Sequence, residues 1–447
     1  MNHNDILTCR TSRRDVPVRA IRRATGIALA AAFALATPAL LAAPGGGKGK
    51  PGDGGGGEDP PPPVDANYTA EYIPIPSWVT GRTATNMNKN GDVVGKGVVK
   101  KGGGSFAEGY VWKNGEHHYL PPLSGDNVSE PYDLSDDGLI VVGDSGSRPG
   151  TLTAWIDFGG GSYDAIDLKA ILLEAAAVLV PEWEFYDFHS GVKNPPASLL
   201  TADGRFMQVL GRSTEGNAVF PYASNFAVVV EWDWSKLLDP LGPVVAMWPL
   251  AQPPVAYPDD PDRNGYTIGG LGIELGVRFE GSDDQVLRLA GYLVPHGADG
   301  MLDWNAEWFA IVWEYDLTDE SALVRILPAI PPDTSGDLLP SNVNIYGAVV
   351  GYPGYFCDPF GNPTKFELLA GATSWAGYVS GINKHEVAVG PYNGSDLAYL
   401  WTAEGGTVDL NTQVEGNLGL SRALFINDNG QILTGGSTGW YVLTPIE

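Results

Sequence analysis

The sequence predicts an all-β protein: a β-propeller-like ring of about seven four-stranded repeats, with the two termini closing one blade. Three observations support this fold class. The 59 glycines and 35 prolines make up roughly a fifth of the 447 residues, which favours many short strands over long helices. A hairpin motif recurs seven times along the chain, and a tryptophan follows each recurrence. Such internal periodicity is typical of repeat folds.

The first 66 residues are expected to lie outside this ring. Several arginines precede an apolar run from Gly26 to Ala36, which ends at small residues as in a secretory signal peptide. The run is shorter than the ~20 apolar residues of a membrane span. We therefore expect a signal peptide over residues 1–42 and no membrane span in the mature chain. Arg13-Arg14 resembles a twin-arginine signal only faintly, so Sec export is favoured.

Residues 43–66 form a Gly/Pro-rich low-complexity segment that ends in four prolines, Pro60 to Pro63. This composition is typical of a linker. A tail without a role is the alternative. The repeat domain is expected to occupy residues 67–447. Because the chain carries an export signal, we expect this domain to be secreted or periplasmic.

The repeats are clearest at Ala84 and Ala423. In each, an apolar strand reaches an Asn-Gly turn, and a β-branched strand returns and stops at a glycine. A third strand then carries the tryptophan, and a fourth segment often ends in leucine. Five further copies begin near Tyr132, Leu200, Val286, Asn344 and Val379. The tryptophans at the shared position are expected to pack between sheets: Trp112, Trp155, Trp232, Trp313, Trp375, Trp401 and Trp440.

Four-stranded units of ~40–50 residues are typical of propeller blades. The last copy lacks a fourth strand, whereas a lone strand-like segment, Glu71–Ile75, precedes the first copy. We therefore expect Tyr72–Ile75 to pair in the same sheet as Trp440–Leu443. Between Leu168 and Val180 the Ala/Leu-rich composition predicts one short inserted helix.

The combination of Ile-Asn, Asn-Gly, Val-Val-Gly and an aromatic-Leu-Trp resembles the bacterial extracellular repeat family called HAF. The segments that resemble it most are Val408–Asn411, Ile426–Ile432 and Tyr441–Pro445. The resemblance is strong over residues 83–168 and 378–445. It implies an exported bacterial protein with a propeller-like domain, and it implies no catalytic residue. His385-Glu386 departs from the pattern, because a turn glycine is expected there.

Charge and cysteine content exclude several classes of function. The chain has 27 basic and 53 acidic residues, a net charge of −26. This sign opposes binding to phosphate backbones, so we expect no nucleic-acid partner. Cys9 and Cys357 supply neither a disulfide framework nor a cysteine zinc site. We expect no cofactor and a monomeric protein.

One segment has the opening spacing of a calcium loop. Asp260, Asp262 and Asn264 place oxygen-bearing side chains at alternate positions before Gly265. The twelfth position is Leu271, so the bidentate acid of an EF-hand is missing. We favour a plain acidic turn and keep weak calcium binding as the alternative.

Aromatic residues in the long middle repeats are the candidate ligand contacts, since loops on a rigid scaffold often bind. Tolerated surface insertions are the alternative. Tyr355 and Phe356 lie in a Pro/Gly-rich stretch that predicts either a ligand platform or a plug over the ring's hydrophobic edge. The other candidates stand near acidic side chains: Trp248, Tyr257, Trp304 and Trp308.

Two classes of function remain open. The favoured one is an exported, non-catalytic binding protein with a glycan or protein ligand. The alternative is an extracellular propeller enzyme acting on polysaccharide, as a glycosidase or a lyase. Two or three convergent carboxylates beside a histidine or arginine in one mouth of the ring would favour the enzyme.

The export signal generates a direct prediction. We expect the mature chain to begin at Ala43, because cleavage after Ala43 would place Pro44 at the new terminus. N-terminal sequencing of exported protein measures this. Exported protein that retains Met1 would contradict it.

Overall fold

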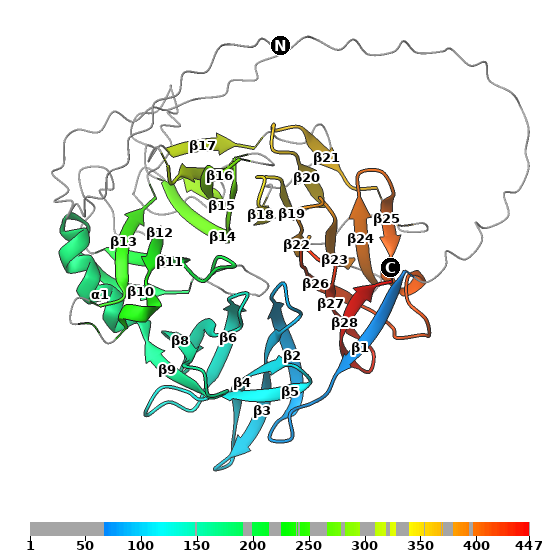
Figure 1. Cartoon of the computed structure of the whole chain (residues 1–447), viewed down its shortest axis with the longest axis horizontal. Helices are drawn as coiled ribbons and strands as arrows, with labels where there is room; N and C mark the ends of the chain where they lie inside the picture. The colour runs from blue at the N-terminus through cyan, green and yellow to red at the C-terminus, as the bar shows by residue number, and fades with distance from the viewer. Residues whose placement is uncertain are drawn as a thin grey trace, which may run out of the picture. The chain divides into compact units, whose positions relative to one another are not determined.

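The computed structural model describes residues 67–147, 150–190, 199–213, 225–237, 239, 242–250, 266–278, 282–295, 309–318, 322–327, 339–352, 354–367, 369, 379–392 and 397–446. Within them the strands form seven antiparallel sheets of four strands each. The sheets stand side by side around a ring, as Figure 1 shows. The chain is a seven-bladed β-propeller, as the sequence predicts.

Six blades follow chain order, with consecutive strands as hydrogen-bonded neighbours. Blade 1 contains β2 (Thr80–Met87), β3 (Val93–Lys101), β4 (Gly104–Lys113) and β5 (Glu116–Leu120). Blade 2 contains β6 (Ser129–Leu134), β7 (Ile140–Ser145), β8 (Thr151–Asp157) and β9 (Tyr163–Asp167). Blade 3 contains β10 (Phe185–His189), β11 (Phe206–Ser213), β12 (Asn225–Trp232) and β13 (Val244–Pro249). Blade 4 contains β14 (Tyr266–Val277), β15 (Gln285–Pro295), β16 (Phe309–Asp316) and β17 (Ala322–Ile326). Blade 5 contains β18 (Leu339–Val343), β19 (Val349–Tyr352), β20 (Tyr355–Cys357) and β21 (Pro363–Lys365). Blade 6 contains β22 (Gly381–Ile382), β23 (Ala388–Tyr392), β24 (Leu397–Thr402) and β25 (Gly406–Asp409).

Blade 7 closes the ring with strands from both ends of the described chain. It contains β26 (Arg422–Ile426), β27 (Ile432–Gly436) and β28 (Gly439–Pro445), and its outer strand is β1 (Tyr68–Ile73). Tyr72 pairs with Tyr441 and Ile73 pairs with Trp440. The predicted closure is confirmed, although the strand ends at Ile73. Pro74 and Pro76 follow, and proline cannot donate to a ladder.

The inserted helix also forms where the composition predicts it. Helix α1 (Leu168–Leu179) begins after Asp167, whose side chain accepts a hydrogen bond from the Ala170 N–H at 3.0 Å. Its apolar face packs into the core between blades 2 and 3. Short 3₁₀ helices occupy Pro181–Trp183, Trp234–Lys236 and Leu410–Thr412. None of the described helices has the length and apolar character needed to span a membrane.

An asparagine closes the turn after the first strand in four blades. In blade 6 the Asn383 Oδ1 accepts hydrogen bonds from the His385 and Val387 N–H groups, both at 3.0 Å. Asn344 makes the same pair of bonds in blade 5. Asn427 and Asn88 do so in blades 7 and 1. These local bonds explain why the sequence motif is Asn-x-x-Gly.

The amide nitrogens of the same asparagines link neighbouring blades. The Asn344 Nδ2 donates to the Asn383 carbonyl at 3.0 Å, and the Asn383 Nδ2 donates to the Asn427 carbonyl at 3.2 Å. The Asn427 Nδ2 donates to the Asn88 carbonyl at 3.1 Å, and the Asn88 Nδ2 donates to the Ser135 carbonyl at 3.0 Å. We call these four asparagines and Ser135 the belt. It runs from blade 5 to blade 2 across the point where the ring closes.

Other groups continue the belt where asparagine is absent. The Asp136 N–H of blade 2 donates to the Ala202 carbonyl of blade 3 at 2.7 Å. From blade 4, Arg288 donates to the Ile345 carbonyl of blade 5. The first strands therefore all end on one face of the ring, which we call the belt face. The opposite face, where these strands begin, is called the loop face.

The antiparallel order fixes which strand ends lie on each face of the ring. Second and fourth strands end on the loop face, and third strands begin there.

The tryptophans occupy fewer equivalent positions than the repeats suggest. Each of four tryptophans pairs with the residue two positions before the glycine of the second strand, and each is at least 95% buried: Trp112, Trp155, Trp313 and Trp401. Trp440 pairs with the glycine itself, Gly435, and Trp232 lies at the end of β12. Trp375 lies outside the described residues. The six of these seven repeat tryptophans that lie within the described residues are all buried, which confirms their predicted packing role.

The aromatic stretch of blade 5 is a strand and not a loop. Gly354 has a φ of +85° and its N–H bonds to the Gly351 carbonyl at 2.9 Å, which makes a tight turn after β19. The chain then enters β20, so Cys357 takes the register position that tryptophan holds in other blades. The prolines and glycines of this stretch flank the short strand and do not interrupt it. The glycine-rich segment Gly269–Gly272 lies within β14, at a bulge.

The departure at Glu386 predicts a gain of stability on replacement. Glu386 has a φ of +59° at the turn position that glycine fills in blades 1, 2, 3, 5 and 7, and this backbone region disfavours a side chain by roughly 1–2 kcal/mol. Glycine's own conformational freedom offsets part of this gain. We expect Glu386→Gly to stabilise the fold by about 0.5–1 kcal/mol and to raise Tm by ~1–3 °C.

Thermal unfolding followed by circular dichroism measures the effect. The matched control is Lys384→Gly in the same turn, which keeps the N–H bond to Asp428 and should lower Tm. An unchanged or lower Tm for Glu386→Gly would refute the prediction.

Candidate functional site

The seam between blades 7 and 1 contains a pocket of about 400 Å³. Its walls come from the start of β2, the start of β26 and the turn between β27 and β28, so it opens on the loop face. Its lining residues are Ile75, Arg82, Thr83, Ser421, Arg422, Gly435, Gly436, Ser437, Thr438, Gly439 and Trp440. Two of them are arginines and none is acidic. The lining is therefore basic, whereas the whole chain has a net charge of −26.

Arg82 is the buried charge of the pocket. Its guanidinium lies 4.7 Å from the centroid of the Tyr72 ring, a cation–π contact. The Nε, Nη1 and Nη2 atoms are shielded from solvent and have no protein acceptor. Burying polar groups without partners is costly, so this guanidinium favours any acceptor that can reach it.

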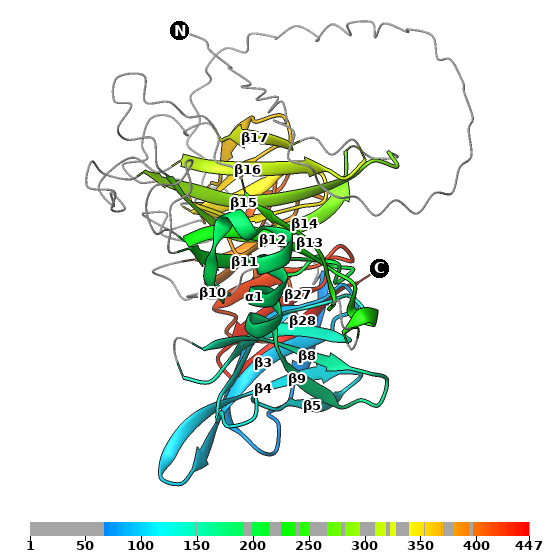
Figure 2. The same cartoon turned by 90° about the vertical axis from the view of Figure 1, so that its left-hand side faces the viewer.

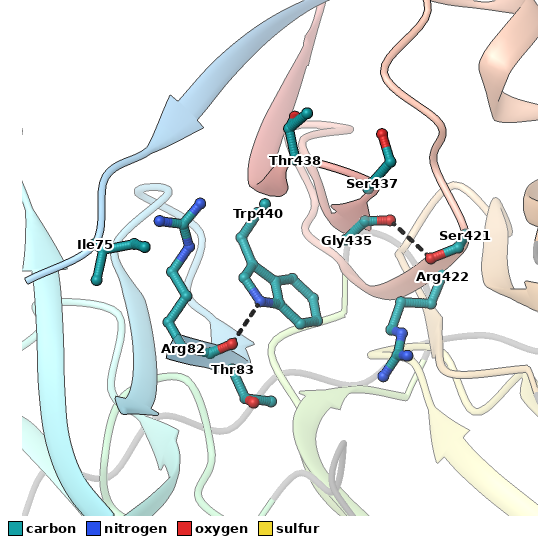
Figure 3. Close-up of a pocket in the computed structure, with 11 residues that line it drawn as sticks. Ile75, Arg82, Thr83, Ser421, Arg422, Gly435, Ser437, Thr438 and Trp440 are labelled. Atoms are coloured by element: carbon teal, nitrogen blue, oxygen red, sulfur yellow. Dashed lines mark hydrogen bonds between the residues drawn. The ribbon is translucent and has the colours of Figure 1, made fainter. Parts of the chain in front are cut away.

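Trp440 divides the pocket. Figure 3 shows its indole between the Arg82 guanidinium on one side and the Arg422 guanidinium on the other. The indole Nε1 donates to the Arg82 carbonyl at 3.3 Å, which holds β28 against β2. The side chain of Arg422 is exposed, in contrast to that of Arg82. The pocket thus presents one buried and one accessible positive charge.

Further basic side chains lie in blade 1 next to the pocket. Between Thr80 and Leu120 the sequence has six basic and three acidic residues. Lys100 and Lys101 stand at the end of β3, and the hairpin of β3 and β4 projects from the ring in Figure 2. Because β3 runs toward the loop face, these lysines lie on the same face as the pocket.

The aromatic candidates from the sequence do not form a shared surface. Tyr355 and Phe356 lie in β20 with 1% and 5% of their surface exposed, so they are core residues and not a ligand platform. Phe356 packs on Trp401 with ring centroids 5.3 Å apart. Trp248 lies in β13 and contacts the rings of Phe206 and Tyr315. It therefore packs between blades 3 and 4.

The other candidates lie outside the described residues. These are Tyr257, Trp304 and Trp308 for ligand contacts, and Asp260, Asp262 and Asn264 for calcium. Among the described side chains, no group of three or more histidine, cysteine, aspartate or glutamate residues could hold a metal ion.

Burial and other carboxylates affect the pKa of one acid on the belt face, Glu274. Glu274 occupies in β14 the register position that Asn88 holds in blade 1. Removal from water raises the pKa of Glu274 well above its ordinary value, and the charges of Asp428, Asp136 and Asp133 raise it further. These three acids belong to blades 7 and 2, so the interaction acts across the ring. Lys89 forms an ion pair with Asp136 at 2.6 Å in the same region.

Comparisons with known proteins identify no family. No family model matches the sequence, and no curated protein matches it. Solved structures similar to this chain include a streptogramin B lyase, with 9% identity, a TM-score of 0.39 and coverage of 85% of this chain and 98% of that chain. Another is the β-propeller domain of the Trilobed protease from Pyrococcus furiosus, with 10% identity, a TM-score of 0.38 and coverage of 82% and 94%. An α-L-arabinofuranosidase from Podospora anserina has 10% identity, a TM-score of 0.28 and coverage of 86% and 98%. At such identities the likeness concerns the fold alone.

Glu274 generates a prediction about pH. Its pKa is raised in the folded state, so its contribution to stability is present at acidic pH and is lost as pH rises through the folded-state pKa. Glu274→Gln keeps an acceptor for the Leu275 N–H but cannot ionise. We expect the variant to have a higher Tm than the parent at neutral pH, and the difference to vanish near pH 4.

Melting curves between pH 4 and pH 8 measure this, with Glu116→Gln at the exposed start of β5 as the matched control. A difference in Tm that is constant with pH would contradict the prediction.

Proposed function

We propose that this chain is an exported, non-catalytic binding protein whose ligand carries negative charge and is held at the seam pocket on the loop face. One observation supports this most directly. The pocket contains two arginines and no carboxylate, although acidic residues outnumber basic ones almost two to one in the chain. Solubility alone does not explain why two positive charges gather in one pocket.

Export is supported by the sequence of the first 66 residues and by the HAF resemblance, both of which indicate a bacterial protein that acts outside the cytoplasm. The linker would separate the propeller from the point where export ends. Binding is favoured over catalysis because the pocket lacks a nucleophile activated by a neighbouring base. Guanidinium groups recognise anions by charge and paired hydrogen bonds.

A binding titration tests the proposed function. The purified chain is titrated by calorimetry with polygalacturonate and, separately, with neutral dextran, at pH 7 and low salt. We expect saturable binding of polygalacturonate only, and no new reducing ends in the polymer after incubation. Equal binding of both polymers, or binding of neither, would overturn the proposal.

A second candidate is an enzyme that cleaves polysaccharide on the belt face. It is favoured by one observation: burial and the charges of Asp428 and Asp136 raise the pKa of Glu274, and glycosidases use a carboxyl group of raised pKa as the general acid. New reducing ends from polygalacturonate or from a neutral glucan, lost in Glu274→Gln, would support the enzyme. Binding without cleavage would favour the first candidate.

A further inference from the structure

The surroundings of Arg82 supply it with no counter-charge. Burial lowers the pKa of the neighbouring His117, and the charge of Arg82 lowers it further. Tyr110 also feels the charge of Arg82, yet burial keeps the pKa of its hydroxyl above the ordinary value. The Tyr110 Oη and His117 Nε2 atoms are themselves buried without partners. The positive charge of Arg82 is therefore not compensated by these neighbours.

The one acidic group on this face of blade 1 is engaged elsewhere. Glu108 lies in β4 opposite Gly97, which in turn pairs with Arg82. It forms an ion pair with Lys101 and a hydrogen bond with Tyr119. The Val79 side chain covers Gly97 and so stands between Arg82 and Glu108. No carboxylate of the described blade 1 pairs with Arg82.

A glycine makes room for the guanidinium. A Cβ on Gly439 would lie 1.9 Å from the Arg82 Nη2, so any larger residue would displace the arginine. Gly439 and the Tyr72 ring cover the guanidinium at the rim of the pocket. Rotation about the flexible side-chain bonds of Arg82 would bring it onto a ligand without moving the strands.

The pocket and its rim suit an extended ligand better than a single small anion. The two guanidiniums lie on opposite sides of the Trp440 indole (Figure 3), an arrangement that suits two linked anionic groups. Tyr72 and Ile75 at the rim are 46% and 48% exposed. An exposed aromatic ring is a stacking surface for a sugar. Lys100, exposed on the projecting hairpin, adds positive charge on the same face.

We propose that the seam pocket binds a linear polysaccharide of acidic sugars, with the carboxylate of one sugar on Arg82, that of another on Arg422, and the chain passing Trp440 and Tyr72. This inference rests on the proposed function and deepens it by naming the ligand class. Planar carboxylates match the guanidinium fork, which a neutral sugar does not. Once one carboxylate of a polymer is bound, the next is held close to the second arginine at a high effective concentration. A single sugar lacks this advantage.

Oligogalacturonates of one, two, four and six residues test the ligand class with the whole chain. We expect the affinity to rise at least tenfold from the single sugar to the hexamer, and the methyl-esterified hexamer to bind at least tenfold more weakly than the free acid. Arg82→Gln and Arg422→Gln should each lower the affinity for the hexamer by about tenfold or more, which corresponds to ~1.4 kcal/mol. Arg82→Lys should retain part of the binding.

The matched control is Lys365→Gln, which removes an exposed cation from β21 in blade 5 and should leave binding unchanged. Unchanged Tm values show that each variant is folded. Hexamer binding that survives both arginine changes would place the site elsewhere, which would refute both the inference and the assignment of the ligand to the seam pocket, and would leave only the binding of an acidic ligand. A single sugar that binds as tightly as the hexamer would refute the polymer. Tighter binding of a sulfated dextran oligomer would refute the assignment to carboxylates. Absence of binding to every acidic oligomer would refute both proposals.

Discussion

The carboxamide of the belt asparagines acts in two directions at once. Its oxygen closes the turn within a blade, and its nitrogen donates to the backbone of the next blade. A carboxylate could perform the first task and not the second, because it has no N–H to donate. The bond from Asn427 to Asn88 joins residues at opposite ends of the described chain. The local turn and the global ring therefore depend on the same side chains, which keeps the seam in register.

The seam pocket exists because of that closure. Neither Arg82 in blade 1 nor Arg422 in blade 7 meets the other until β1 and β28 pair and the belt joins blade 7 to blade 1. Trp440 then lies against the Arg82 carbonyl and divides the hollow. Binding and ring integrity are coupled in this arrangement, since a ligand that engages both arginines bridges the two blades and adds its binding energy to the closed form.

Sequence patterns predicted the parts of the fold that local chemistry determines. The Asn-x-x-Gly turns and the buried tryptophans marked the hairpins, and the lone segment before the first repeat indicated the closing strand. β20 was missed because the strand has only three residues and lies in a stretch rich in proline and glycine. The arginine pair could not be found from spacing, since Arg82 and Arg422 are neighbours only through ring closure. The cluster of basic residues between Thr80 and Leu120 was a signal present in the sequence.

The pairing of β1 with β28 also sets the order of events during synthesis. Tyr72 is synthesised long before its partner Tyr441. At ~5–20 residues per second, the first strand waits roughly 20–70 s for its place in the sheet. Until then blade 7 lacks its outer strand and the ring stays open.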